Sequence, residues 1–200
     1  MPYRSVAIFL SLLAAALLLS ACAAKKTTQP SASDFQKPDI SLASFQVPQF
    51  DGYWYYDKSI EPTMGEAGDH GAPLPMSFLF RVDNPNPYPV KIDNLSYTVS
   101  FEGFSLKTVN NNDDYWIPAE GTDHIRSTTM ITVRSAILSL KVASGFKLKE
   151  KGWTAPQALE RWWNKIPMLE VPVQVEEGRA AFHANGVSEV ATFEGTYPED

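Results

Sequence analysis

The side chains that could do chemistry are few and lie far apart in the sequence. The three histidines, His70, His124 and His183, fall in unrelated predicted elements, and for each we expect an ordinary histidine with no partner. His70 has Glu66 and Asp69 nearby, but their loop lacks the spacing of a metal site. The motifs of serine hydrolases, zinc peptidases, phosphate loops and dinucleotide-binding folds are missing. We therefore expect no catalysis, no cofactor and no bound metal ion.

Cys22 carries the clearest chemical prediction. It is the only cysteine, and it closes the tetrapeptide Leu19–Cys22, which matches the bacterial lipobox. Processing at a lipobox acylates the cysteine and makes it the new N-terminus. Residues 1–21 fit the corresponding signal peptide, because the apolar run Val6–Leu19 is short for a membrane span. An uncleaved membrane anchor is the alternative, since residues 20–24 are also uncharged.

The residues after the cysteine predict where the protein lies. Ala23, not aspartate, follows Cys22, and by resemblance to enterobacterial sorting rules this implies the outer membrane, facing the periplasm. Residues 22–38 are small and polar, which indicates a flexible tether about 50 Å long at about 3.3 Å per residue. The predicted membrane contact is therefore the lipid on Cys22.

Composition limits the other partners. Without residues 1–21 the chain keeps 16 basic and 23 acidic residues, a net charge of −7. This charge argues against nucleic acid and against tight binding to anionic lipid head groups. A hydrophobic content of 44% and an aromatic content of 12% are enough for a folded core. We expect one domain over residues 39–200.

The centre of this domain is the stretch from Phe78 to Phe101. Alternating apolar residues predict a strand up to Val82 and another that ends at Phe101. Between them, the prolines of residues 84–89 (NPNPYP) break the ladder, and the two asparagines can stabilise tight turns by bonding their own backbone. Irregular spacing at Asp93 and Asn94 indicates a bulge.

Three short motifs in this region carry a family resemblance. They are residues 84–86 (NPN), residues 95–99 (LSYTV) and residues 117–121 (IPAEG), the last read as a β-hairpin cue. Their order and spacing resemble the type-2 late-embryogenesis-abundant family, also called the water-stress and hypersensitive-response (WHy) domain. The residues that match the family motifs, expected to be structural, are Asn84, Pro85, Asn86, Leu95, Tyr97, Pro118 and Gly121.

The resemblance implies a fold and a role. The fold is an all-β, seven-stranded sandwich of immunoglobulin or fibronectin III type. The role is that of a non-enzymatic envelope protein that protects other proteins or membranes during desiccation or freezing. These expectations come from the family and not from the composition of this chain.

The other predicted strands follow from alternation and turn residues. They cover residues 39–47, 104–109, 124–133, 169–182 and 187–197, with the first pairing with the Met76 strand and Asn185-Gly186 forming a hairpin before the last. Pro172 within its run indicates an edge strand.

One or two short helices are expected before the last two strands. Ser135 is expected to cap a helix over residues 136–143, with Gly145 as its stop. The second helix begins with a capping box at Thr154 and ends at Pro167. It places Leu159, Trp162, Trp163 and Ile166 on one face. We expect this helix to cover one end of the sandwich.

The aromatic run Tyr53, Trp54, Tyr55 and Tyr56 leaves two interpretations open. Tyrosine and tryptophan dominate binding hot spots, so the run is a candidate partner surface. Aromatic residues on a strand also cover the end of a sandwich, with half of them pointing inward. The alternative function is accordingly a module for envelope assembly, which binds a protein client or partner through this run or through an exposed strand edge.

Overall fold

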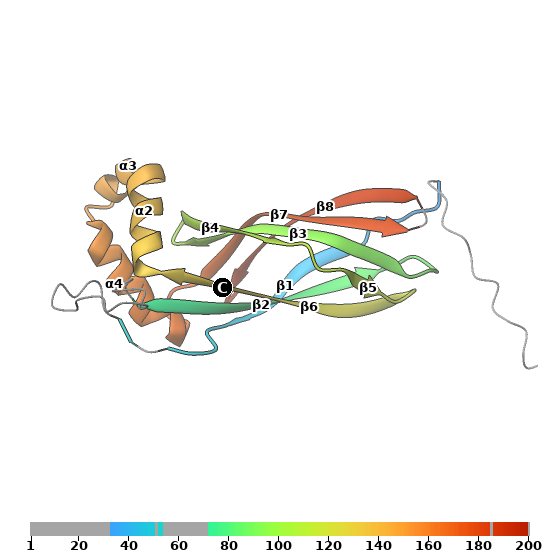
Figure 1. Ribbon diagram of the computed structural model, residues 1–200, viewed down its shortest axis with the longest axis horizontal. Helices are drawn as coiled ribbons and strands as arrows, with labels where there is room; N and C mark the ends of the chain where they lie inside the picture. Colours follow the sequence, from blue (N-terminus) through green and yellow to red (C-terminus); the bar gives the residue numbers. More distant parts are fainter. Residues whose placement is uncertain (1–32, 51, 54–71, 185, 200) are drawn as a thin grey trace, which may run out of the picture.

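Two antiparallel sheets pack face to face in the computed structural model, which describes residues 33–50, 52–53, 72–184 and 186–199 (Figure 1). One sheet has three strands in the order β1-β2-β6, and the other has five, in the order β4-β3-β7-β8 with β5 also beside β3. The strands are β1 (Asp39–Gln46), β2 (Pro73–Asn84), β3 (Val90–Phe101), β4 (Phe104–Asn111), β5 (Tyr115–Ile117), β6 (Gly121–Thr132), β7 (Val173–Ala184) and β8 (Val187–Tyr197).

The predicted all-β sandwich is confirmed, but the described residues form eight strands and not seven. The additional strand is β5, whose three residues pair with the beginning of β3. A run of three residues is too short to show alternation, which is why the sequence did not predict it. The bulge expected in β3 is present, between Ile92 and Asn94 in the pairing with β7.

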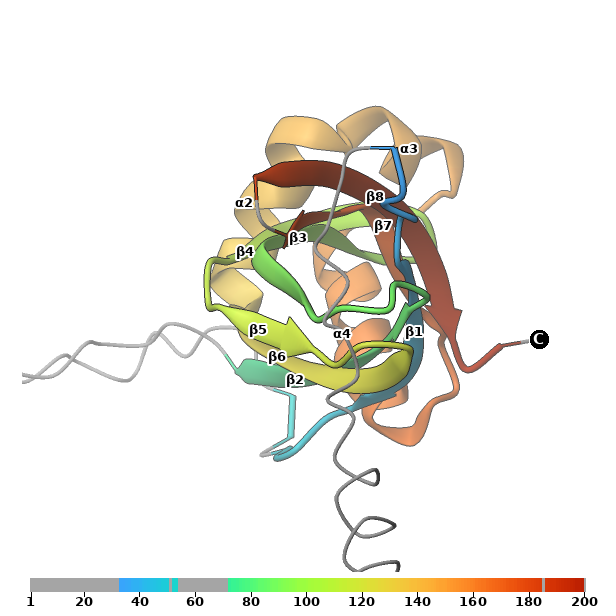
Figure 2. The same cartoon turned by 90° about the vertical axis from the view of Figure 1, so that its right-hand side faces the viewer.

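The two sheets meet along one edge, where β1 lies beside β8 (Figure 2). Gly195 on β8 allows this approach, because a Cβ atom there would lie 2.7 Å from the Cβ of Leu42 on β1. Behind this edge, the rings of Phe80, Tyr97 and Phe193 pack at centroid distances of 5.1 and 5.3 Å. The core therefore runs continuously between both sheets.

Two predictions about β7 are corrected. The strand begins at Val173 rather than Leu169, whose φ of 58° places it in the left-handed region and ends the preceding helix. Pro172 consequently stays outside the strand. The strand lies between β3 and β8, so the predicted edge position is wrong.

The hairpin expected at residues 117–121 is also wrong. Strand β5 before this turn belongs to the five-stranded sheet and β6 after it belongs to the three-stranded sheet, so the turn carries the chain between sheets. Glu120 adopts a φ of 50°, and a Cβ on Gly121 would meet Pro118 Cγ at 2.9 Å. This tight geometry lets the chain cross between sheets within a few residues.

The helices lie together at one end of the sandwich (Figure 1). They are α2 (Val133–Ala143), α3 (Gly145–Glu150), α4 (Ala155–Lys165) and the 3-10 helix η2 (Ile166–Met168). Thr132, not Ser135, caps α2, and Gly145 begins α3 instead of ending the helical region. The capping box at Thr154 is confirmed. Within the described part of the chain, no helix is long and apolar enough to span a membrane.

The tryptophan pair of α4 explains why the helices stay at this end. Trp162 and Trp163 are both 0% exposed. The Trp163 Nε1 donates to the Ala72 carbonyl oxygen at 3.1 Å, and the Trp162 ring packs against Phe101 and Phe104. The expected cover over one end of the sandwich is therefore present, and its tryptophans belong to the core.

Candidate functional site

Asn84 is a buried residue at the end of β2, where the three prolines and two asparagines of residues 84–89 interrupt the sheet. Its Nδ2 donates to the carbonyl oxygens of Tyr88 and Pro118, both at 2.9 Å. Its Oδ1 accepts from the backbone N of Asn86 at 3.0 Å, the local turn bond that asparagine favours. One amide thus fixes the loop after β2 and also the turn that crosses between sheets.

Asn86 is fully buried and joins the same network from the other side. Its Oδ1 accepts from the Gln36 backbone N at 2.8 Å, and its Nδ2 donates to the Gln36 carbonyl oxygen at 2.6 Å. A second bond from Nδ2 reaches Asn84 Oδ1 at 2.9 Å. We call Asn84 and Asn86 with these partners the asparagine clamp. It closes the end of the sandwich opposite the helices.

The side-chain amides of Asn84 and Asn86 are hydrogen-bonded within the protein, whereas the buried hydroxyl of Tyr88 has no hydrogen-bond partner among the described residues. The amide of Asn86 is paired on both sides, and its backbone carbonyl accepts from Glu120 N at 2.8 Å. Leaving any of these buried groups unpaired would cost free energy, so they are held in one arrangement. The role we assign to the family motif is therefore the fixing of three chain segments at one end of the fold.

Tyr97, from the same motif region, joins the two sheets. It is 1% exposed, and its hydroxyl donates to Ser127 Oγ on β6 at 2.9 Å. Burial disfavours the charged phenolate and raises the pKa of Tyr97 to about 12, although the bond to Ser127 acts in the opposite direction. Leu95, two residues earlier, is also fully buried. These motif residues lie in the core and are not available to a partner.

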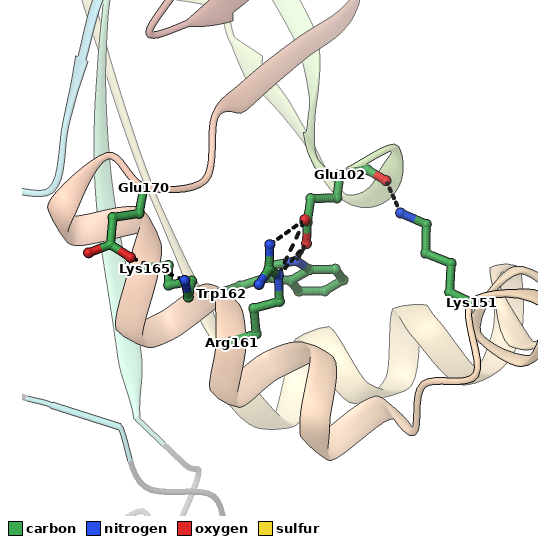
Figure 3. A network of polar contacts seen from close by, with 6 residues as sticks. All are labelled: Glu102, Lys151, Arg161, Trp162, Lys165 and Glu170. Atoms are coloured by element: carbon green, nitrogen blue, oxygen red, sulfur yellow. Dashed lines mark hydrogen bonds and ion pairs between the residues drawn. The ribbon is translucent and has the colours of Figure 1, made fainter.

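Glu102 connects the sheet to the helices (Figure 3). It lies in the tight turn between β3 and β4, where its φ is 48° and that of Gly103 is 80°. Its carboxylate accepts from Arg161 Nη2 at 2.9 Å and from Trp162 Nε1 at 2.7 Å. Burial opposes the ionisation of Glu102, but these two hydrogen bonds, together with the positive charges of Arg161 and Lys151, outweigh it and lower its pKa. Both carboxylate oxygens accept hydrogen bonds from α4, so Glu102 holds the turn between β3 and β4 against this helix.

A polar groove of about 740 Å³ crosses the five-stranded sheet over β4, β3, β7 and β8. It surrounds the bulge at Glu177 and Gly178, where Glu177 accepts from Thr98 Oγ1 at 3.2 Å. Arg179 and Glu194 also line it. The groove offers hydroxyl and carboxylate groups to a polar ligand. No sequence pattern predicted it, because its residues come from four strands.

The described residues contain no group of three or more potential metal-ligating side chains. His183 differs from the expectation of an unpartnered histidine, because its Nε2 lies 2.9 Å from Asp93 Oδ1. The loop with His70, Glu66 and Asp69 lies outside the described residues.

Two sequence-predicted sites fall wholly or mostly outside the described part of the chain. Cys22 and residues 1–32 are not described. Of the aromatic run only Tyr53 is described, and it is partly buried and packs against the core. Trp54, Tyr55 and Tyr56 lie outside. The lipid site and the candidate partner surface therefore stay predictions.

Several solved structures are similar in overall arrangement at low identity. A crystal structure of a protein from Archaeoglobus fulgidus has a TM-score of 0.40 and 13% identity, covering 80% of this chain and 98% of that one. A candidate ApaA protein from Bordetella pertussis has a TM-score of 0.42 and 8% identity, covering 82% and 94%. A solution structure of a candidate late embryogenesis abundant protein has a TM-score of 0.38 and 12% identity, covering 98% of this chain and 87% of that one. At such low TM-scores, these likenesses carry no argument about function.

The amino-acid sequence matches one family model and no curated protein. A search of curated proteins finds none that matches this chain. The family model described as late embryogenesis abundant protein matches residues 79–177. This range contains Tyr97 and the whole asparagine clamp except Gln36. This match supports the assignment of the chain to the type-2 late-embryogenesis-abundant family.

Proposed function

We propose that this chain is a non-enzymatic envelope lipoprotein that protects proteins or membranes during desiccation or freezing. The observation that carries the proposal is the family match over residues 79–177. The geometry agrees with it, because the motif residues Asn84, Asn86 and Tyr97 have their polar groups engaged inside the fold. Such residues stabilise a scaffold and leave no reactive group exposed.

Anchoring is the first part of the proposal. Cys22 would carry the lipid, and the tether over residues 22–38 would hold the domain at the outer membrane, facing the periplasm. Several acyl chains give firm anchoring, since each buried CH₂ contributes about 0.8 kcal/mol. Labelling cells with a palmitate analogue tests this directly. Wild type should be labelled and sediment with membranes, and Cys22→Ser should lose the label. Equal labelling of both would rule out lipidation at Cys22.

Protection is the second part. A net charge of −7 keeps the mature chain soluble while salts concentrate, and a folded sandwich need not fold upon its client. Shielding of this kind is weak and unspecific, so it should need near-stoichiometric protein and should not distinguish among clients. Residues 22–200 with Cys22→Ser should preserve a freeze-sensitive enzyme through freezing and thawing better than an equal mass of an unrelated acidic protein. Equal loss of activity with both proteins would contradict the proposal.

Partner binding is a second candidate, favoured by one open edge of the sandwich. In the described residues, β6 pairs only with β2, so the other edge of its twelve residues is not covered by a strand. Trp116 on β5 and Met130 on β6 are 62% and 52% exposed. An extended segment of an envelope partner could add to this edge.

The aromatic run separates the two functions. Joint substitution of Tyr53, Trp54, Tyr55 and Tyr56 by alanine should leave unspecific protection intact, provided that the melting temperature is unchanged. Loss of protection at an unchanged melting temperature would instead identify the run as a dedicated binding surface, and would favour the partner-binding function.

A further inference from the structure

The helical end of the molecule exposes apolar side chains that a soluble protein would normally bury. Val142 and Phe146 are each 87% exposed, and Leu138 is 59% exposed. Leu138 and Val142 are one helical turn apart on α2, and Phe146 follows in the first turn of α3. A cluster of this kind within nine residues is a marker of an interaction surface, whereas single exposed apolar residues are ordinary.

The same helices carry a local positive charge. Residues 133–151 contain five basic residues and one acidic residue, a net charge of +4 in a chain whose total is −6. Lys147 and Lys151 turn towards the sheet, where they donate to the backbone carbonyls of Gly103 and Glu102 and lie over the Phe104 ring. The remaining three, Arg134, Lys141 and Lys149, are exposed and form no ion pair within the described part of the chain.

On α2 the exposed basic and apolar residues lie on one side of the helix. Arg134, Leu138, Lys141 and Val142 follow the spacing of three to four residues that places side chains on one side of a helix. The opposite side of α2 is buried through Ala136, Ile137 and Leu140. On α3, Leu148 is buried while Phe146 and Lys149 are exposed. We call Arg134, Leu138, Lys141, Val142, Phe146 and Lys149 the α2–α3 face.

The α2–α3 face is rigidly supported and lies at the tip of the molecule. Thr132 and Ser135 form a capping box at the start of α2, and Ser139 Oγ donates to the Leu106 carbonyl oxygen at 3.1 Å. Figure 1 shows α2 and α3 beyond the turn that joins β3 and β4, at the end where β2 begins, whereas the asparagine clamp lies where β2 ends. The α2–α3 face therefore belongs to the helical end of the molecule, away from the clamp.

We infer that the α2–α3 face docks onto an anionic phospholipid bilayer, with the apolar side chains entering the interface and the basic ones contacting head groups. Exposed apolar residues beside basic ones on short helices are the composition of an interfacial membrane site. This inference rests on the membrane setting of the proposed function and adds a second membrane contact to the lipid on Cys22.

The acidity of the whole chain does not prevent this docking. Strands such as β2, with twelve residues, span about 40 Å at about 3.3 Å per residue. Charges at the far end therefore lie several Debye lengths away, because this length is about 8 Å at physiological ionic strength. The local charge of +4 therefore decides how the helical end approaches an anionic bilayer, although the net charge of the whole chain is negative.

Vesicle sedimentation tests the inference with residues 22–200 carrying Cys22→Ser, which contain every described helix and strand and no lipid. The vesicles are phosphatidylcholine alone, or phosphatidylcholine and phosphatidylglycerol in equal parts. Binding should occur with the anionic vesicles only and should weaken as salt is added. Joint replacement of Arg134, Lys141 and Lys149 by glutamine should weaken binding about 100-fold, at about 1 kcal/mol for each basic residue.

The apolar contribution has its own variant and controls. Joint replacement of Leu138, Val142 and Phe146 by serine should abolish binding without lowering the melting temperature, because these side chains are exposed. Val190→Ser and Arg81→Gln make changes of the same kind at exposed positions on β8 and β2, and should bind as wild type does.

Three results would overturn the inference. They are the absence of anionic-vesicle binding by the folded wild type, unchanged binding by both α2–α3 variants, and self-association through this face in place of vesicle binding. None of these depends on the labelling of Cys22 or on enzyme protection. A failure of the proposed function is therefore distinguishable from a failure of the docking face.

Discussion

Replacing Asn86 by alanine removes the centre of the asparagine clamp. The side chain makes three hydrogen bonds, two with the Gln36 backbone at 2.8 and 2.6 Å and one with Asn84 Oδ1 at 2.9 Å. At about 1 kcal/mol net for each bond, the loss is about 3 kcal/mol. The side chain is 0% exposed, so water cannot readily replace it. At about 2–4 °C per kcal/mol, the melting temperature should fall by about 6–12 °C.

Thermal unfolding followed by circular dichroism measures this effect, with Asn94→Ala as the matched control. Asn94 is exposed and makes one side-chain hydrogen bond, to Asn112 at 3.1 Å, so its loss should change stability by less than about 0.5 kcal/mol. Similar melting temperatures for Asn86→Ala and Asn94→Ala would refute the reasoning that the buried bonds hold this end of the sandwich together.

Asn86→Asp separates the donors from the acceptor. It keeps an acceptor for Gln36 N but replaces Nδ2, which donates to two oxygens, by a carboxylate oxygen. The buried carboxylate would keep the Gln36 N–H as a donor, but its second oxygen would face the oxygens of Gln36 and Asn84, and this should raise its pKa above the unfolded value of about 3.9. The variant should therefore become less stable as the pH rises through the raised pKa, and recover as the pH falls. A loss of stability that is the same at every pH would contradict this account.

Three further perturbations test other parts of the fold. Gly178→Ala should destabilise the protein by about 1–3 kcal/mol, because its Cβ would lie 2.4 Å from Phe193 O. Gly145→Ala has open space around its Cβ and should not destabilise it. Chemical denaturation compares the stabilities of the two variants. Tyr97→Phe should lower the stability by about 1–2 kcal/mol, because it leaves buried Ser127 Oγ without its hydrogen-bond donor. In the wild type, the phenol of Tyr97 should stay protonated in an absorbance titration up to pH 11, as long as the protein is folded. Glu102→Gln should cost about 1 kcal/mol at neutral pH. Because the folded pKa of Glu102 is lowered, wild type should lose this advantage as the pH falls through that pKa, and a gap between the two stability curves that stays constant into acid would be inconsistent with the ion pair.

Local patterns in the sequence predicted much of the fold. Alternation gave β1, β2 and most of β3 and β8, because a half-buried strand repeats its environment every two residues. The capping box at Thr154 placed the start of α4 correctly, since both of its hydrogen bonds form within one turn. These features depend on residues that are close in the chain.

The misses depend on contacts between distant residues. Asn86 bonds to Gln36 across 50 positions, and no spacing rule reports such a pair. The turn before Gly121 looks the same whether the next strand pairs with the last one or joins the other sheet. Leu169 continued an alternating pattern, yet its left-handed conformation ended the preceding helix instead.

The α2–α3 face was hidden for a different reason. Net charge is an average over the chain, and the acidic residues elsewhere outweigh the five basic residues between positions 133 and 151. Hydrophobic spacing also predicts burial, and only the packing of α2 shows that Val142 lies on the side that faces away from the core. The α2–α3 face is therefore visible only in the folded protein, where the positions of the charges and the exposure of the side chains are known.

Survival of cells through drying tests the central claim most directly. Cells in which the gene is deleted should survive drying and rewetting less well than wild type, and the wild-type gene should restore survival. Cys22→Ser should restore it only in part, because the domain would no longer be held at the membrane. Equal survival of deleted and wild-type cells, in drying and in freezing alike, would contradict a protective function for this protein.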